Sequence, residues 1–108
     1  MTGNNDYLAN GHFGFGNVIQ FLKEGKACRR SGWNGEGLFI VKQVPSHIEG
    51  DVIPKMQSLP QSAKDILMSR ETPHIDYTNQ MLIINPDGRA DSWVPSVSDV
   101  FAEDWEVL

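Results

Sequence analysis

Apolar residues recur at helical spacing near the start of the chain. Phe15, Val18, Ile19 and Leu22 fall at positions i, i+3, i+4 and i+7, which places them on one face of an α-helix. The sequence then predicts a helix end at Gly25, because glycine readily takes the left-handed conformation of a C-terminal cap. We therefore expect an N-terminal helix that packs its apolar face on the core.

Two antiparallel strands joined by a glycine-rich turn are expected next. Residues 27–30 form a short first strand, in which Cys28 and Arg30 point to one face. Asn34-Gly35 is a strong turn signal, and residues 38–44 are apolar enough to return as the second strand. Neighbouring arginines would lower the pKa of Cys28, but a small buried core cysteine is the favoured interpretation.

A second pair of strands follows in the last third of the chain. Residues 75–84 read as one strand, Asp87-Gly88 as a tight turn, and residues 89–94 as the returning strand. A short helix is then predicted after Pro95, and residues 106–108 add a last edge strand. These elements, with the first helix, predict an α+β fold: one antiparallel sheet with an N-terminal helix and short helices packed on it.

The C-terminal helix carries a capping signature. The hydroxyl of Ser96 can accept a backbone N–H at the start of this helix, and the carboxylate of Asp99 can accept one in return. Val100 and Phe101 supply a short apolar face, and Trp105 is expected to anchor the helix in the core. The capped helix start also offers amides and hydroxyls to an anion.

The remaining segments are less regular. Residues 1–14 are rich in asparagine and glycine, which predicts a flexible leader before a single domain at 15–108. Residues 45–73 read as a variable insertion, with a loop at 46–51 and a helix at 59–68. We expect Ser58 to cap that helix and Pro60 to lie in its first turn.

Charge and composition narrow the classes of partner. The chain of 108 residues has a formal net charge of −5, which argues against binding a long nucleic acid polymer. No apolar run approaches the roughly 20 residues that span a bilayer, so no membrane association is expected. The single cysteine excludes an intramolecular disulfide and fits a reducing compartment.

Signatures of catalysis are thin. His12, His47 and His74 lie far apart, with no partners at metal-ligand spacing. The chain has no nucleophile elbow, P-loop or dinucleotide-binding fingerprint. We therefore expect no catalytic residues, no metal, no cofactor and no enzymatic activity, and we interpret the acids Asp99, Glu103 and Asp104 as a solvated face.

The signals for ligand binding are better. Trp33 lies between glycines in the predicted turn, where its ring either closes the core or stacks on a planar base. The amide of Asn34 can read a base edge or a ribose hydroxyl. Arg29 and Arg30 lie on opposite faces of their strand, so at least one is available to solvent, to an interface or to a phosphate.

An ordered set of motifs resembles the Thoeris anti-defence 2 family of small phage and prophage proteins. The motifs are Phe15-Gly16, Leu22-Lys23-Glu24-Gly25-Lys26, Arg30-Ser31-Gly32-Trp33-Asn34-Gly35, Trp93-Val94-Pro95-Ser96-x-Ser98-Asp99 and Ala102-Glu103-Asp104-Trp105-Glu106. Each motif alone is weakly specific, whereas their order along the chain is specific. They cover roughly residues 15 to 44 and 74 to 108.

The resemblance implies a sponge rather than an enzyme. Members of the family bind, and hold uncleaved, a cyclic ADP-ribose isomer such as glycocyclic ADP-ribose that bacterial TIR-domain proteins make. They are homo-oligomers, typically tetramers, with pockets between subunits, and some also take cyclic dinucleotides in a separate pocket, which would extend the block from Thoeris to CBASS effectors. The expected place of action is the cytoplasm of the infected bacterial host.

The resemblance also implies which residues lie near the ligand. They are Trp33, Asn34, Trp93, Ser96 and Asp99, with Phe15 and Arg30 as supporting candidates. Val97 departs from the polar residue usual in the family, and the segment at 45–73 is longer than in compact members. A structural or protein–protein interaction module without a nucleotide ligand is the alternative, and a hydrolase of the same nucleotides is a weaker one.

Overall fold

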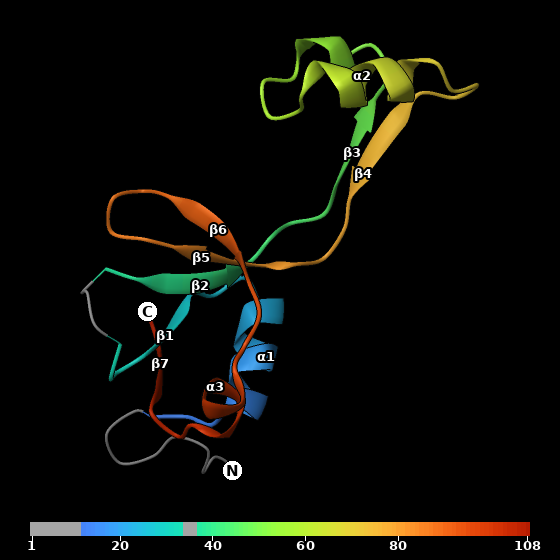
Figure 1. The fold of residues 1–108 in the computed structure, drawn as a ribbon. Helices are drawn as coiled ribbons and strands as arrows, with labels where there is room; N and C mark the ends of the chain where they lie inside the picture. The colour runs from blue at the N-terminus through green and yellow to red at the C-terminus, as the bar shows by residue number, and fades with distance from the viewer. Residues whose placement is uncertain (1–11, 34–36) are drawn as a thin grey trace. The chain divides into compact units, whose positions relative to one another are not determined.

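The computed structural model describes residues 12–33 and 37–108, which form two compact units (Figure 1). Within the described part, the first unit comprises residues up to Gln43 together with Gln80–Leu108, and the second unit comprises Val44–Asn79. Asn34 and the predicted turn at Asn34-Gly35 lie outside the described residues.

A five-stranded antiparallel sheet, in the order β6-β5-β2-β1-β7, forms the framework of the first unit. Its strands are β1 (Cys28–Arg30), β2 (Phe39–Lys42), β5 (Met81–Ile84), β6 (Ala90–Trp93) and β7 (Trp105–Val107). The helices α1 (Phe15–Lys23) and α3 (Val97–Phe101) belong to the same unit and contact each other. The expected α+β class is confirmed. β1 pairs with β2 and β5 pairs with β6, both antiparallel, and β7 is the edge strand expected at the C-terminal end.

The apolar face of α1 packs on one face of this sheet. Val18 and Leu22 are buried in the core together with Cys28, Ile40 and Trp105. Burial of these side chains explains why a helix of nine residues is stable here, since so short a helix is marginal in isolation. Cys28 is completely buried, which confirms the expected core cysteine, and this burial raises the pKa of its thiol to about 11.

Phe13 belongs to this core as well. Its side chain is 4% exposed, and its backbone exchanges two hydrogen bonds with Trp105, at 2.8 and 3.1 Å. The ring also packs edge-on against Phe21, with the centroids 4.9 Å apart. Phe13 therefore belongs to the core, although the sequence placed it in the leader expected at 1–14.

The second unit is built on a two-stranded antiparallel sheet. Its elements are β3 (Ser46–Glu49), the 3₁₀-helix η1 (Ile53–Lys55), α2 (Gln61–Met68) and β4 (His74–Tyr77). Ile53 is completely buried, whereas α2 buries none of its side chains fully. A Cβ atom at Gly50 would lie 2.8 Å from the carbonyl oxygen of Pro73, so only glycine fits where the chain leaves β3.

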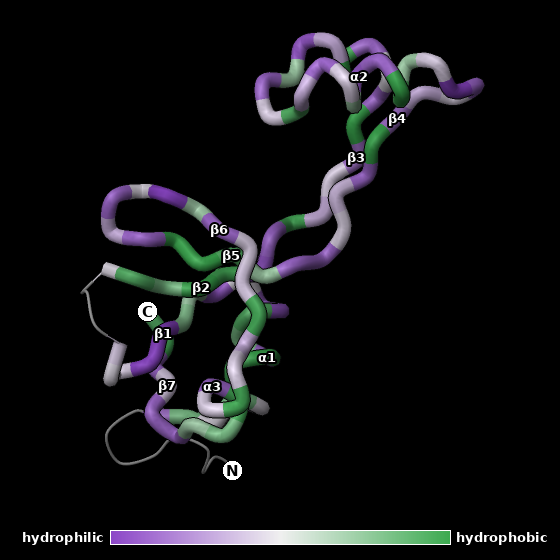
Figure 2. Tube along the Cα trace, in the orientation of Figure 1, coloured by the Kyte–Doolittle hydropathy of each residue, from purple (hydrophilic) through white to green (hydrophobic). Residues whose placement is uncertain are grey.

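Three expectations for this region were wrong. The predicted loop at 46–51 is mostly strand β3, and the predicted strand at 75–84 is two strands in two different sheets. Pro60, not Ser58, is the N-cap residue of α2, and its side chain makes no capping hydrogen bond. β4 pairs with β3, whereas β5 pairs with β2. The polar residues 78–80 lie between these two strands, just before the hydrophobic β5 (Figure 2).

None of the helices in the described ranges is long and apolar enough to cross a membrane.

Candidate ligand-binding site

Four aromatic rings meet at one end of the core of the first unit. We call Phe15, Trp33, Trp93 and Trp105 the aromatic cluster. The ring centroids of Trp33 and Trp93 are 6.2 Å apart, and those of Trp33 and Trp105 are 5.3 Å apart, both pairs edge to face. Phe15 lies 5.4 Å from Trp105 and 6.4 Å from Trp93. These are the distances at which aromatic rings attract one another.

The members of the aromatic cluster differ in their exposure. Trp105 is 0% exposed, and its indole N–H donates a 2.9 Å hydrogen bond to the backbone oxygen of Asp99. Trp33 and Trp93 pack against this buried core but remain partly exposed. Trp105 is therefore the core anchor that the sequence predicted. Trp33 packs on the core and also presents ring surface to solvent, so it can serve both of its expected roles.

Arg30 joins two carboxylates beside the aromatic cluster. Its Nε atom donates to Oδ1 of Asp104 at 2.9 Å, and its Nη1 atom donates to Oδ1 of Asp99 at 3.0 Å. These side chains are only 24%, 30% and 13% exposed, respectively. The guanidinium that the resemblance assigned to the ligand is thus already engaged by two acids of its own chain.

The second oxygen of Asp99 completes the predicted capping box. Oδ2 accepts a 2.9 Å hydrogen bond from the backbone N–H of Ser96, and the backbone N–H of Asp99 donates to Oγ of Ser96 at 3.1 Å. Burial disfavours the charged carboxylate, but the hydrogen bonds from Ser96 and Arg30 outweigh burial and lower the pKa of Asp99. The cap is confirmed, and its polar groups are engaged with one another.

Asp104 is a polar residue whose contacts the sequence did not reveal. Asp99 and Asp104 are not a solvated face, because both bind Arg30. The backbone oxygen of Asp104 also accepts a 2.9 Å hydrogen bond from the N–H of Ser31. Burial raises the pKa of Asp104, and its partner Arg30 lowers it by more, so the net shift is downward. Only the pairing of β1 with β7 brings these residues together, so no local signal identifies them.

The predicted site residues therefore fall into two adjoining groups. Phe15, Trp33 and Trp93 belong to the aromatic cluster, while Arg30, Ser96 and Asp99 form a polar network attached to it through Trp105. Asn34 lies outside the described residues. Together the two groups offer partly exposed aromatic side chains beside an ion-paired network. Such aromatic side chains suit stacking on a planar ring.

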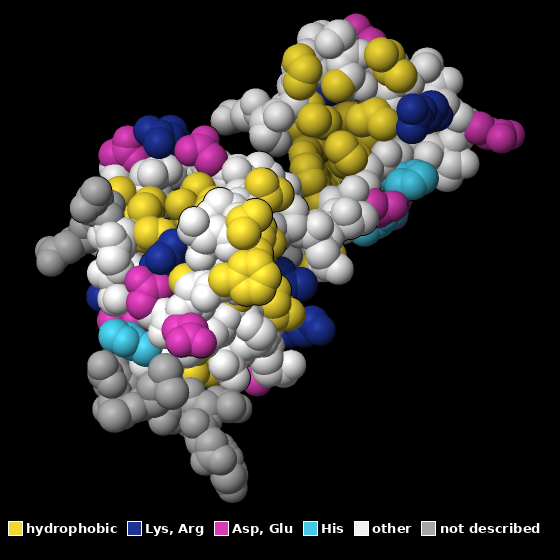
Figure 3. All heavy atoms as spheres, turned by 60° about the horizontal axis from the view of Figure 1, so that its bottom comes forward, with side chains coloured by type: hydrophobic (Ala, Val, Ile, Leu, Met, Phe, Trp, Pro, Cys, Tyr) yellow, Lys and Arg dark blue, Asp and Glu magenta, His cyan; other side chains and the backbone are white. Residues whose placement is uncertain are grey.

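The surface next to this site is apolar. Val94, Val97 and Phe101 are 82%, 75% and 78% exposed, and Val100 is 38% exposed. The apolar face of α3 that the sequence predicted is thus turned mainly towards solvent, and hydrophobic side chains gather on the surface of this unit (Figure 3). Single exposed apolar residues are ordinary, whereas four within eight consecutive positions form an unusual apolar surface.

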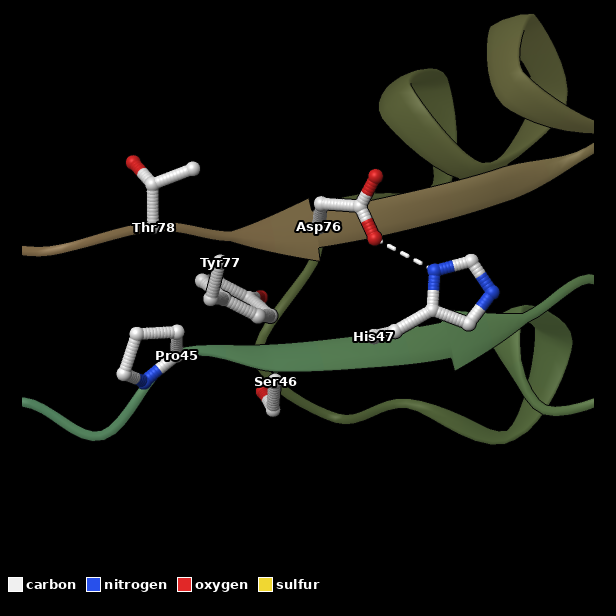
Figure 4. Close-up of a pocket in the computed structure, with 6 residues that line it drawn as sticks. All are labelled: Pro45, Ser46, His47, Asp76, Tyr77 and Thr78. Atoms are coloured by element: carbon white, nitrogen blue, oxygen red, sulfur yellow. Dashed lines mark hydrogen bonds and ion pairs between the residues drawn. The ribbon is translucent and has the colours of Figure 1, made fainter.

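The second unit contains a shallow pocket of its own. Figure 4 shows its lining by Pro45, Ser46, His47, Asp76, Tyr77 and Thr78. Nδ1 of His47 is hydrogen-bonded to Oδ1 of Asp76, and Nε2 lies 2.7 Å from Oε1 of Glu49. Asp76 first, and then Glu49, raise the pKa of His47. Across residues 12–33 and 37–108, no three potential ligands are arranged to hold a metal ion.

Sequence comparison places this small α+β protein, with its aromatic cluster and capped terminal helix, among phage anti-defence proteins. The Thoeris anti-defense 2-like domain family matches residues 13–108, and the chain therefore belongs to that family. The protein named "Thoeris anti-defense 2" of Bacillus phage SP01 is 28% identical over 94 residues, which cover 87% of this chain and 92% of that protein. The resemblance drawn from the ordered motifs is confirmed.

Proposed function

We propose that this protein is a non-catalytic sponge that opposes Thoeris defence by binding a TIR-derived cyclic ADP-ribose signal of the glycocyclic ADP-ribose type. The single observation that carries the proposal is the aromatic cluster, in which Trp33 and Trp93 lie 6.2 Å apart with ring surface still exposed. Membership of an anti-defence family supports the biological role. By holding the signal, the protein would leave the defence effector without its activator in the cytoplasm of the infected cell.

Sequestration requires tight binding of the nucleotide and no chemical reaction. A purine can stack on an exposed indole face, and such stacking is worth about 1–3 kcal/mol per base. Capture of a scarce signal requires a Kd below its concentration; a nanomolar Kd corresponds to about −12 kcal/mol. The buried Trp105 and the ion pairs of Arg30 hold the indoles in place before binding, which reduces the entropic cost of ordering them.

The proposal includes self-association. The exposed side chains of Val94, Val97 and Phe101 lie on the segment that follows Trp93, so a second copy docked there would enclose the edge of the aromatic cluster. Enclosure between chains would give a small protein a deeper pocket than one chain provides. We propose a homo-oligomer, a tetramer in line with the family expectation, and cyclic dinucleotides as a further ligand class.

The experiment incubates the purified protein with glycocyclic ADP-ribose, separates bound from free nucleotide, and then denatures the protein by heat. Intact nucleotide should be released in stoichiometric amount, and Trp33→Ala should retain much less of it. Degraded nucleotide would instead support the hydrolase. A protein that retains no nucleotide would support the structural module.

A further inference from the structure

Three charged residues lie on strand positions of the sheet face that packs against the core. Arg30 follows the buried Cys28 by two positions, and Lys42 follows the buried Ile40 by two. Ile83 lies directly opposite Ile40, and Asp91 lies directly opposite Ile83. Because side chains two apart on a strand share a face, as do directly opposed residues, all three point to the core side of the sheet. Charges on such a face normally have partners.

Two of these three residues have partners. Arg30 binds Asp99 and Asp104, as described above, and Asp91 accepts a 2.9 Å hydrogen bond from Nε of Arg89. Lys42 is the exception. It is partly buried, yet its side chain makes no hydrogen bond or ion pair within the part of the chain that the structure describes. An unpaired ammonium is notable here, because acidic residues outnumber basic ones by 14 to 9.

The register of the sheet puts Lys42 in the same row as a member of the aromatic cluster. Lys42 is directly opposite Met81 on β5, and Met81 is directly opposite Trp93 on β6. Neighbouring strands lie about 5 Å apart, so the backbones of Lys42 and Trp93 are about 10 Å apart, with both side chains on one face. A nucleotide that stacks its base on Trp93 is long enough to extend its phosphates towards Lys42.

We propose that Lys42 supplies the positive charge that meets the phosphate groups of the nucleotide. The assignment rests on the proposed sponge function and refines it. A lysine takes this role because Arg30, the cation nearer to the tryptophans in the network, is already neutralised by Asp99 and Asp104. The ordinary alternative is that Lys42 only covers Met81 with its methylene stem and leaves its ammonium in water.

Variants of Lys42 separate charge from packing. Lys42→Met keeps the stem and removes the charge, Lys42→Gln is a second neutral variant, and Lys42→Arg keeps the charge. Lys23→Met is the matched control, because Lys23 is an exposed lysine on α1 that also has no partner among the described residues. Melting temperatures of all four should lie close to that of the parent, since no ion pair is lost.

Titration calorimetry with glycocyclic ADP-ribose then tests the role. Both neutral Lys42 variants should raise Kd about tenfold or more, the loss expected for a charged hydrogen bond, with Lys42→Arg and Lys23→Met near the parent value. The difference in Kd between the neutral Lys42 variants and the parent should become smaller at high salt. Parent-like binding by Lys42→Met would overturn the assignment of Lys42 and leave the sponge intact. A parent protein that binds no nucleotide would overturn both.

Discussion

Arg30 and Asp99 lie 69 residues apart in the chain, yet Nη1 of the arginine donates a 3.0 Å hydrogen bond to Oδ1 of the aspartate. The same carboxylate closes the capping box of α3 through its other oxygen. The carboxylate of Asp99 therefore both caps the N-terminus of α3 and connects this helix to β1. Loss of these two interactions should lower the stability of the protein.

Substitution of Asp99 by alanine should destabilise the protein by about 1–3 kcal/mol, because the helix cap and a partly buried charged hydrogen bond are lost together. Denaturant unfolding monitored by tryptophan fluorescence measures the change. Glu103→Ala is the control, since this exposed acid has no partner in the described ranges and should change stability by less than about 0.5 kcal/mol. Equal midpoints for the two variants would contradict the role given to Asp99.

The two carboxylates that bind Arg30 should make the protein sensitive to acid. Both pKa values are lowered from the ordinary 3.8, so the stabilisation is complete above that value and is lost as the pH falls through the lowered pKa values. Unfolding midpoints measured between pH 6 and pH 2 should therefore fall mainly below about pH 4. In the double variant Asp99→Asn, Asp104→Asn the unfolding midpoint should fall less steeply with decreasing pH. The same pH dependence in the variant and the parent would contradict the role given to this network.

Trp33 and Trp105 should respond differently to substitution. Trp105→Ala removes a fully buried ring and should cost about 3–5 kcal/mol, a large part of the stability of a small domain. Trp33→Ala removes a partly exposed ring, so the protein should remain folded while nucleotide binding is lost. Thermal unfolding with and without glycocyclic ADP-ribose distinguishes the two effects. If Trp33→Ala unfolds the domain as Trp105→Ala does, Trp33 serves the fold instead.

Local features of the sequence predicted local features of the structure. The apolar spacing from Phe15 to Leu22 and the Ser96–Asp99 pair each involve residues within one helix, and both were confirmed. The link between Arg30 and Asp104 depends on the register in which Arg30 lies opposite Trp105, which no local pattern encodes. The single strand predicted at 75–84 was wrong because the polar residues 78–80 separate β4 from β5. The local pattern also does not show which strand each of them pairs with.

The sequence named the residue types of the candidate site but did not show how its polar residues pair with one another. The residues alone left Trp33 open between core packing and stacking, and only the family resemblance assigned Trp33 and Trp93 to the ligand. The engagement of Arg30 by two acids could not be foreseen, since an arginine in a strand suits a phosphate and a carboxylate equally well. The unpaired state of Lys42 likewise becomes visible only when the contacts of every other charge on that face are known.

The β3–β4 sheet of the second unit should become more stable as the pH falls towards neutrality and below. His47 of β3 is flanked by Asp76 and His74 from β4 and by Glu49 from its own strand. Its pKa is raised by Asp76 first and by Glu49 second. The stabilisation is therefore complete below the ordinary value of about 6.5 and is lost as the pH rises through the raised pKa.

Titration of the imidazole by NMR, together with amide hydrogen exchange in β3 and β4 corrected for intrinsic rates, tests this expectation. The titration midpoint of His47 should lie above 6.5, the ordinary value for histidine, and Asp76→Asn should lower it. Protection of the β3 and β4 amides against hydrogen exchange should decrease between pH 6 and pH 8.5 in the parent protein and change less in Asp76→Asn. Amides of β2 and β5 serve as the internal control, because no histidine lies on those strands. If the amides of β3 and β4 are equally protected at both pH values, the ion pairs of His47 do not hold the two strands together.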